Sequence, residues 1–288
     1  NATYGDLVLK PRSMAILQPK RPCCVPTETE IKIMIHPQAL IDPSAEIDDG
    51  VTIGPFTTVG AGVTIGSGTV IGSHVVVKGP TQIGRDNRIY QFSSVGEDTP
   101  DLKYQGEPTR LLIGDNNVIR EGVTIHRGTV QDRSETIIGN DNLLMAYAHI
   151  GHDCVVGNHT ILVNNASISG HVVVDDWAIL SGYALVHQYV HIGAHAFVGP
   201  GSFLYHDVPA FVTATGSPAE PRTINREGMK RRGFNADQIA LVNKAYKILY
   251  RRGLTLEEAL ADIIELSADP AVAQFHASVL RSQRGIIR

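Results

Sequence analysis

The stretch YAHIGHDCVVGN, residues 147–158, places two histidines three residues apart and a carboxylate directly after the second. His149, His152 and Asp153 could bind a metal ion, or His152 could act as a general base that Asp153 orients. The three could also be ordinary polar residues of a solvated surface. The local spacing leaves these interpretations open, and the choice depends on the face of the fold on which the side chains lie.

A six-residue repeat of aliphatic residues predicts the elements that position these side chains. Ile, Val or Leu occupies every sixth position over residues 35–95, 113–125 and 138–204. Helices repeat every 3.6 residues and strands every 2, so neither alone produces a period of six. A short strand followed by a tight turn does, and three such units close one triangular coil. The repeat therefore predicts a parallel β-helix whose stacked coils bury a continuous aliphatic core.

Two interruptions of the repeat predict loops over residues 96–112 and 131–137. If both segments leave the coil, counting in threes places Val95, Ile125 and Ile150 on one side of the prism. The polar residues and glycine that follow the aliphatics of this side share it: His126, His152, Asp153, Gly170, His171, His187 and Gln188. We predict that this column is functional, although polar turn positions of a solvated β-helix would have a similar composition.

The pattern divides the chain of 288 residues into three parts. Residues 1–33 lack the repeat, are rich in proline and are expected to be a loosely ordered N-terminal extension. Residues 34–212 are expected to form the β-helix with its two loops. Residues 213–288 change to a helical pattern and are expected to form a C-terminal α-helical domain, so the fold class is mainly β.

Within the helical part, cap residues predict where individual helices begin and end. Asn235, Thr255 and Asp269 are suitable N-caps, and Gly233 and Gly253 are stop signals. Basic residues are dense in this part: Lys230, Arg231, Arg232, Lys244, Lys247, Arg251 and Arg252. They predict contact with an anionic partner or a phosphate-bearing substrate, or else an ordinary solvated helix surface.

Composition excludes several classes of protein. The net charge of -4 offers no strong basic field, so nucleic acid is not an expected partner. No apolar stretch approaches the length of about 18 residues that suggests a transmembrane segment. The three cysteines, Cys23, Cys24 and Cys154, argue against a disulfide framework and fit a reducing compartment. A soluble, cytoplasmic protein is therefore expected.

Two kinds of chemistry suit the histidine column. A zinc site, as in hexapeptide-repeat carbonic anhydrases, would need neutral imidazoles converging at about 2.0–2.1 Å from the ion. Acyl transfer to a hydroxyl would need a base and an oxyanion donor. His152 meets the first need and the backbone N–H of Gly170, one eighteen-residue coil further on, meets the second. Asp153 and Gln188 among the histidines favour acyl transfer.

The repeats resemble those of the left-handed β-helix acyltransferases, which implies a left-handed coil. The segments DLKYQGEPTR, VTIHRGTVQD, NLLMAYAHIGHDC, NNASISGHV, VHQY and EGMKRRGF resemble, more narrowly, the UDP-N-acetylglucosamine O-acyltransferases of lipid A biosynthesis. This resemblance covers residues 34–288, including the helical tail. It implies transfer of an (R)-3-hydroxyacyl chain from acyl carrier protein to the 3-hydroxyl of UDP-N-acetylglucosamine, the first step of that pathway.

The resemblance also implies a role for each site residue. His152 would take the proton from the sugar hydroxyl, Asp153 would assist or orient His152, and Gly170 would stabilise the oxyanion. Other cleft residues would be His149, His171, His187 and Gln188. Asp101, Lys103 and His126 would help to hold the sugar nucleotide, and Asn225, Glu227, Arg231 and Arg232 its nucleotide and phosphates. No metal or cofactor is implied beyond the phosphopantetheine of the acyl carrier protein.

A flat prism face is a poor binding site, because small molecules need a concave pocket. The resemblance implies a homotrimer with clefts between subunits, and threefold symmetry would give three equivalent sites. Two alternatives remain. The N-acyltransferase of the same pathway shares the repeat and the donor, but normally carries an N-terminal domain that 33 residues are too few to form. A non-enzymatic solenoid scaffold is the other.

One residue departs from the pattern of the family. Pro200 occupies a position near the far end of the acyl groove, where glycine is a familiar choice. Its ring should shorten the groove by several carbons. Since each buried methylene contributes about 0.8 kcal/mol, we expect a preference for donors of roughly ten or twelve carbons over fourteen.

Overall fold

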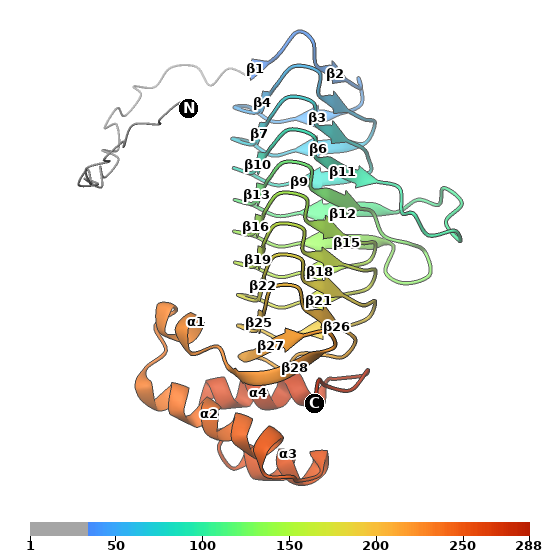
Figure 1. The fold of residues 1–288 in the computed structure, drawn as a ribbon. Helices are drawn as coiled ribbons and strands as arrows, with labels where there is room; N and C mark the ends of the chain where they lie inside the picture. The colour runs from blue at the N-terminus through green and yellow to red at the C-terminus, as the bar shows by residue number, and fades with distance from the viewer. Residues whose placement is uncertain (1–33) are drawn as a thin grey trace, which may run out of the picture. The chain divides into compact units, whose positions relative to one another are not determined.

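The computed structural model describes residues 34–288, and the extension expected over residues 1–33 lies outside the described residues. Short parallel strands wind into three-sided coils that stack along one axis, with helices at the C-terminal end of the stack (Figure 1). The parallel β-helix predicted from the six-residue repeat is confirmed.

The strands form three sheets, one for each side of the prism. Sheet 1 contains β1 (Met34–Ile35), β4 (Thr52–Ile53), β7 (Val70–Ile71), β10 (Arg88–Ile89), β13 (Val118–Ile119), β16 (Leu143–Leu144), β19 (Ile161–Leu162), β22 (Ile179–Leu180), β25 (Phe197–Val198), β27 (Val212–Gly216) and β28 (Ala219–Ile224). Sheet 2 contains β2 (Leu40–Ile41), β5 (Thr58–Val59), β8 (Val76–Val77), β11 (Ser94–Glu97), β14 (Thr124–His126), β17 (His149–Ile150), β20 (Ser167–Ile168), β23 (Leu185–Val186) and β26 (Phe203–Leu204). Sheet 3 contains β3 (Glu46–Ile47), β6 (Val63–Ile65), β9 (Thr81–Ile83), β12 (Arg110–Ile113), β15 (Glu135–Ile138), β18 (Val155–Val156), β21 (Val173–Val174) and β24 (His191–Ile192).

In each two-residue strand one side chain points inward and the other outward, because alternate residues of a strand point to opposite faces. The inward residues Ile125, Ile150 and Ile168 are fully buried and lie in register on β14, β17 and β20. The side of the prism predicted by counting in threes is therefore confirmed as sheet 2. The turn after most strands contains one residue with positive φ, among them Asp153, His171 and His195.

Buried polar side chains bond the coils to one another inside the turns from sheet 3 into sheet 1. The Asn117 side-chain amide donates to Asn87 Oδ1 at 3.0 Å, and the Asn142 backbone N–H donates to Asn117 Oδ1 at 3.0 Å. Asn142 Oδ1 in turn accepts from the Thr160 hydroxyl. Because buried polar groups are costly without partners, this ladder fixes the stacking distance and the register of the coils.

The two loops leave the prism at the same edge, as predicted, but they span residues 98–109 and 127–134, so their bounds differ from those expected (Figure 1). Residues 96–97 belong to β11 and residues 110–112 to β12, although they were expected within the loop 96–112. Residues 135–137 of the expected loop 131–137 belong to β15. The two strands β12 and β15 pair from Arg110↔Glu135 onward, and an ion pair joins these two side chains. This outward extension of the ladder has no hexad pattern, so the sequence repeat did not reveal it.

The helical part begins at Arg226, whereas it was expected from residue 213. Before it, the antiparallel strands β27 and β28 extend sheet 1 at the end of the prism. Four helices follow: α1 (Arg226–Arg231), α2 (Ala236–Arg251), α3 (Leu256–Ile264) and α4 (Pro270–Leu280). Asn235, Thr255 and Asp269 are N-caps, as predicted. Within residues 34–288, no helix combines the length and the apolar composition that crossing a membrane requires.

Candidate active site

The turns that lead from sheet 2 into sheet 3 bring the predicted histidines together, and we call this the histidine edge. It comprises the turn residues His152 and Asp153 after β17, Gly170 and His171 after β20, and His187, Gln188 and Tyr189 after β23. The backbone N–H of His171 donates to the His152 carbonyl at 2.9 Å, so successive turns stack directly. His187 lies one coil further along and donates from Nδ1 to the Gln188 carbonyl at 3.2 Å.

Asp153 is a fully buried carboxylate with three donors around it. It accepts from the backbone N–H of Thr129 at 3.0 Å, from the Thr129 hydroxyl at 2.6 Å and from His152 Nδ1 at 2.8 Å. Burial alone would raise the pKa of the Asp153 carboxyl, but these hydrogen bonds and the nearby His171 hold it below its ordinary value. Asp153 is therefore a fixed anion.

The bond to Asp153 determines where His152 carries its proton. A carboxylate can only accept, so Nδ1 of His152 holds the hydrogen and Nε2 keeps a free lone pair. The side chain of His152 is 15% exposed, so the ring is held by its surroundings but can reach a ligand. A neutral imidazole oriented by a buried carboxylate has the geometry of a general base.

Two glycines leave space around that base. A Cβ at Gly170 would stand 2.5 Å from both Nε2 and Cε1 of His152, so only glycine lets the ring occupy its place. A Cβ at Gly151 would stand 2.8 Å from the backbone nitrogen of Gly170. Among residues 34–288, the Gly170 N–H has no acceptor. The base and an unused backbone donor thus lie side by side, which is the arrangement that acyl transfer needs.

His171 couples the edge to the second loop. Its Nδ1 donates to the Asp132 carboxylate at 2.8 Å, its ring meets the His152 ring edge-on at 4.8 Å, and Tyr189 stacks on it at 4.2 Å. Asp132 lies in the loop between β14 and β15, so the histidine edge orders this loop and the loop in turn orients His171.

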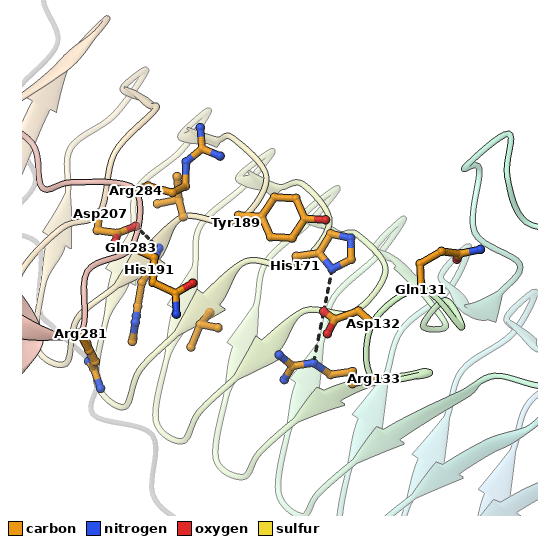
Figure 2. Close-up of a pocket in the computed structure, with 12 residues that line it drawn as sticks. Gln131, Asp132, Arg133, His171, Tyr189, His191, Asp207, Arg281, Gln283 and Arg284 are labelled. Carbon is orange, nitrogen blue, oxygen red and sulfur yellow. Dashed lines mark hydrogen bonds and ion pairs between the residues drawn. The ribbon is translucent and has the colours of Figure 1, made fainter.

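A cavity of about 650 Å³ opens beside His171, on the outer face of sheet 3 (Figure 2). Loop residues Asp132 and Arg133 form one wall, and Arg281 and Arg284 of the C-terminal segment form the opposite wall. Arg281 is neutralised by an ion pair with Asp175. Arg284 donates only to the Tyr205 carbonyl, through Nε, so its terminal nitrogens have no protein acceptor among the described residues.

On the other side of His152, His149 and His126 continue the column toward the first loop. Their ring centroids lie 5.3 Å apart, and Thr124 Oγ1 bonds His149 Nδ1 at 2.8 Å. Burial, then the charges of His126 and His152, lowers the pKa of His149 to about 4, so His149 is neutral at pH 7. His126 Nδ1 donates to the Asp98 carbonyl at 2.7 Å, at the base of the loop that carries Asp101 and Lys103.

A metal ion is the alternative that the histidines raised. Nitrogen or oxygen atoms of His152, Asp153 and His171 lie within 4.8 Å of one another. However, Nδ1 of both imidazoles already donates to a carboxylate. A zinc ion bound through these atoms would have to displace both protons, since zinc ligation requires the imidazole lone pair. Only Nε2 of each ring is left for a metal ion, and Nε2 of His152 is the same atom that a general base would use.

The predicted nucleotide-binding residues lie at a different edge, where turns lead from sheet 3 into sheet 1. We call it the tryptophan edge, after Trp177 and its stacked neighbour His195. Asn225 caps α1 and donates to the His195 carbonyl at 2.9 Å, and Arg232 contacts both rings. Arg231 and Glu227 are exposed on α1. Pro200 lies at the third edge, in the turn after β25.

Three residues that organise the histidine edge were missed by sequence reasoning. Thr129 and Asp132 bind the two key turns from a loop more than twenty residues away in sequence. Arg127 is buried and donates to the Gly79 and Gly96 carbonyls, with an ion pair to Asp98. The only available signal was their place directly after the repeat ending at Ile125.

The chain is similar to transferases with hexapeptide repeats. A model described as bacterial transferase hexapeptide (six repeats) matches residues 44–79 and 135–170. A UDP-N-acetylglucosamine acyltransferase from Francisella novicida is 42% identical, with a TM-score of 0.87 over 88% of this chain and 94% of that chain. The UDP-N-acetylglucosamine O-acyltransferase of Moraxella catarrhalis is 46% identical, with a TM-score of 0.86 over 88% and 99%. The fold is thus the left-handed β-helix of hexapeptide-repeat acyltransferases.

Sequence relatives narrow the class to one family. A model described as UDP N-acetylglucosamine O-acyltransferase, domain 2, matches residues 207–287. An acyl-(acyl-carrier-protein)–UDP-N-acetylglucosamine O-acyltransferase of Stutzerimonas stutzeri is 65% identical over 212 residues, 73% of this chain and 82% of the relative. The relative of the same name in Pseudomonas fluorescens is 67% identical over 203 residues, 70% and 79%. The chain belongs to this O-acyltransferase family, and the alternatives of N-acyltransferase, zinc enzyme and scaffold are not favoured.

Proposed function

We propose that this protein transfers an (R)-3-hydroxyacyl chain from acyl carrier protein to the 3-hydroxyl of UDP-N-acetylglucosamine, the first step of lipid A biosynthesis. The observation that carries the proposal is the pair formed by His152, whose Nε2 is free, and the unused N–H of Gly170 beside it. Membership of the O-acyltransferase family supports the choice of substrates.

In the proposed reaction, His152 Nε2 takes the proton of the sugar 3-hydroxyl. At the same time the hydroxyl oxygen of the sugar attacks the carbonyl carbon of the thioester. The carbonyl oxygen becomes an oxyanion that accepts a hydrogen bond from the Gly170 N–H. When the intermediate collapses, the C–S bond breaks and the thiolate leaves with the proton held by Nε2. Asp153 remains ionised throughout and stabilises the imidazolium that forms between the two steps.

The remaining site residues are assigned to binding. We propose that Asp101, Lys103 and His126 bind the sugar nucleotide. The residues that line the cleft in this proposal are His149, His171, His187 and Gln188. We assign the nucleotide and its phosphates to Asn225, Glu227, Arg231 and Arg232. Because these groups lie at two edges of one prism, a homotrimer in which the tryptophan edge of one subunit approaches the histidine edge of the next would complete the site.

The donor is proposed to arrive on the phosphopantetheine arm of acyl carrier protein, with no other cofactor. The cavity beside His171 offers room for such an arm, and Arg284 at its wall, which forms no ion pair among the described residues, suits an acidic partner (Figure 2). The buried free thiol of Cys154 fits the reducing cytoplasm as the compartment of the reaction.

The deciding experiment is incubation with UDP-N-acetylglucosamine and (R)-3-hydroxyacyl carrier protein, read by mass spectrometry. We expect a product acylated through oxygen, and turnover that survives prolonged chelation. Acylation of a glucosamine amine instead would identify the N-acyltransferase reaction, and loss of turnover on metal removal would support the zinc alternative. No product from either acceptor would overturn the proposal.

A further inference from the structure

At the tryptophan edge, Arg232 is held by two ring contacts. Its guanidinium lies over the Trp177 ring, 5.2 Å from the centroid, and its Nη1 lies 3.2 Å from His195 Nδ1. The backbone N–H of Arg232 also closes the last turn of α1, where it donates to the Gly228 and Met229 carbonyls. Both ends of this residue are therefore fixed.

The His195 ring is itself immobilised. It is 8% exposed, stacks on Phe211 at 5.0 Å and nearly parallel to Trp177 at 6.3 Å, and meets Phe234 edge-on at 5.2 Å. Asn225 donates to its backbone carbonyl. The stacked rings fix the plane of the imidazole, so it cannot tilt away from Arg232 without breaking the aromatic ladder that runs along the turns from His159 to Phe211.

The contact with Arg232 requires a neutral His195 whose Nδ1 accepts, because a guanidinium can only donate. Burial, then the charge of Arg232, lowers the pKa of His195 to about 4, which agrees with this requirement. Asp176 acts in the opposite direction, but its carboxylate is already bonded to Asn158. Imidazole and indole thus hold the cation without neutralising it.

The charge of Arg232 remains available to a ligand. Within residues 34–288, no carboxylate forms an ion pair with Arg232, and its Nε and Nη2 have no hydrogen-bond acceptor. Lys230 on the same helix differs, since it pairs with Glu227, and Arg231, which has no ion pair among the described residues, is exposed. A half-buried, oriented and unneutralised guanidinium is a receptor for an anion such as phosphate.

We propose that His195 and Trp177 are positioning residues that hold the Arg232 guanidinium for the diphosphate of the sugar nucleotide. The inference rests on the proposed function, which supplies a nucleoside diphosphate as ligand. It adds two residues outside the histidine column to the binding machinery, and both act through Arg232 without touching the reacting atoms.

The test compares a variant of His195 with a variant of His159, which also stacks on Trp177. His195→Phe keeps a flat ring against Phe211 but removes the acceptor for Arg232. The matched control is His159→Phe, which keeps a ring against Trp177 and contacts Arg232 in neither form. We expect His195→Phe to raise KM for UDP-N-acetylglucosamine about tenfold, with kcat, thermal midpoint and KM for the acyl donor within about twofold of the parent. His159→Phe should leave all four unchanged.

Trp177 provides a readout that does not need turnover, because it is the only tryptophan of the chain. Titration with UDP should change its fluorescence, UMP should bind more weakly and uridine should have no effect. His195→Phe should weaken UDP binding about tenfold relative to His159→Phe. Equal UDP affinity in the two variants would overturn the inference, and so would a rise confined to KM for the acyl donor, whose phosphodiester is the other possible anion. Absence of acyl transfer by the parent protein would overturn the proposed function but not the anion site. The fluorescence titration measures UDP binding without turnover and would still test that site.

Discussion

The histidine edge and the tryptophan edge each have a histidine at the same turn position, but the two rings form opposite kinds of hydrogen bond. His171 at the histidine edge and His195 at the tryptophan edge are each the positive-φ residue of a turn between two sheets, and both stack on an aromatic ring. His171 donates its Nδ1 proton to the Asp132 carboxylate, whereas His195 Nδ1 accepts from the Arg232 guanidinium. The backbone gives the two rings equal geometry, and the partner decides where the proton lies.

The difference extends to what each edge can do. At the histidine edge, buried Asp153 orients a base and leaves Nε2 of His152 open to a substrate. At the tryptophan edge, stacked rings close the space around His195, so only the cation beyond it remains available. We therefore propose that proton transfer belongs to the histidine edge and recognition of the nucleotide diphosphate to the tryptophan edge. Substitutions at one edge should change rate, and those at the other should change affinity.

The largest expected effect is that of His152→Ala. Loss of a general base costs about 10²–10⁴-fold in kcat, and the partly exposed ring contributes little to the core, so the fold should persist. Steady-state kinetics and thermal unfolding would measure both. His159→Phe at the tryptophan edge is the control and should remain within about twofold of the parent. Near-normal turnover of His152→Ala would show that the base lies elsewhere.

Gly170→Ala should have the next largest effect. The new methyl group would stand 2.5 Å from His152 Nε2, so the ring must move, and a misplacement of about 1 Å can cost on the order of 10²-fold in rate. Gly182→Ala is the matched control, because Gly182 also precedes a turn residue of positive φ but its nearest neighbour would be 3.4 Å away. Equal kcat values for the two variants would contradict the assigned role of Gly170.

Stability should fall in acid because of two histidines, half-buried His149 on β17 and buried His195 at the tryptophan edge. The pKa values of His149 and His195 are lowered from 6.5 to about 4. The unfolded chain therefore binds more protons between these values, and their stabilisation is present above pH 6.5 and lost as pH falls toward 4. Carboxylates with lowered pKa, such as Asp153, add a loss only below their ordinary value of 3.8.

Chemical denaturation from pH 7 to 4 would measure this loss. His149→Gln should flatten part of the pH dependence, because Gln cannot be protonated in this range. A denaturation midpoint that stays constant between pH 6.5 and 4 would mean that neither imidazole is as strongly desolvated as its surroundings indicate.

The smallest expected effect concerns the third edge. Pro200→Gly should shift the preferred acyl donor toward longer chains, since each additional methylene that can be buried contributes about 0.8 kcal/mol. A competition assay with donors of mixed length would compare the variant with the parent. The same preferred length in both proteins would show that Pro200, which is exposed in the single chain, does not limit the groove.

Much of the fold followed from the sequence because the repeat acts locally and identically in every coil. The spacing of Ile125, Ile150 and Ile168 predicted both the shared sheet and the polar column beside it. The start of the helical part was wrong, because β27 and β28 pair antiparallel at the end of the prism and have no six-residue pattern. The loop ends were wrong for a similar reason, since β12 and β15 extend outward as a pair.

The partners of the site residues could not be predicted in this way. Asp132 reaches His171 across 39 positions, and Arg232 reaches His195 across 37. Such contacts depend on how a loop or a helix folds back on the prism, which no period in the sequence records. His195 was accordingly left outside the predicted site, although its type and its turn position are the same as those of His171.

The polar ladder of Asn87, Asn117 and Asn142 has a consequence for how this chain tolerates changes in length. Where coils follow one another without a loop, an insertion or deletion that is not a multiple of six residues would displace every later aliphatic from its inward position. One that is not a whole coil would also move later polar residues away from the edge that carries the ladder. The histidine edge is different, because two loops of unequal length already leave it without disturbing the register of β12 or β15. Insertions can thus be accommodated mainly in the two loops beside His152. The substrate preference can therefore change during evolution while the β-helix remains the same.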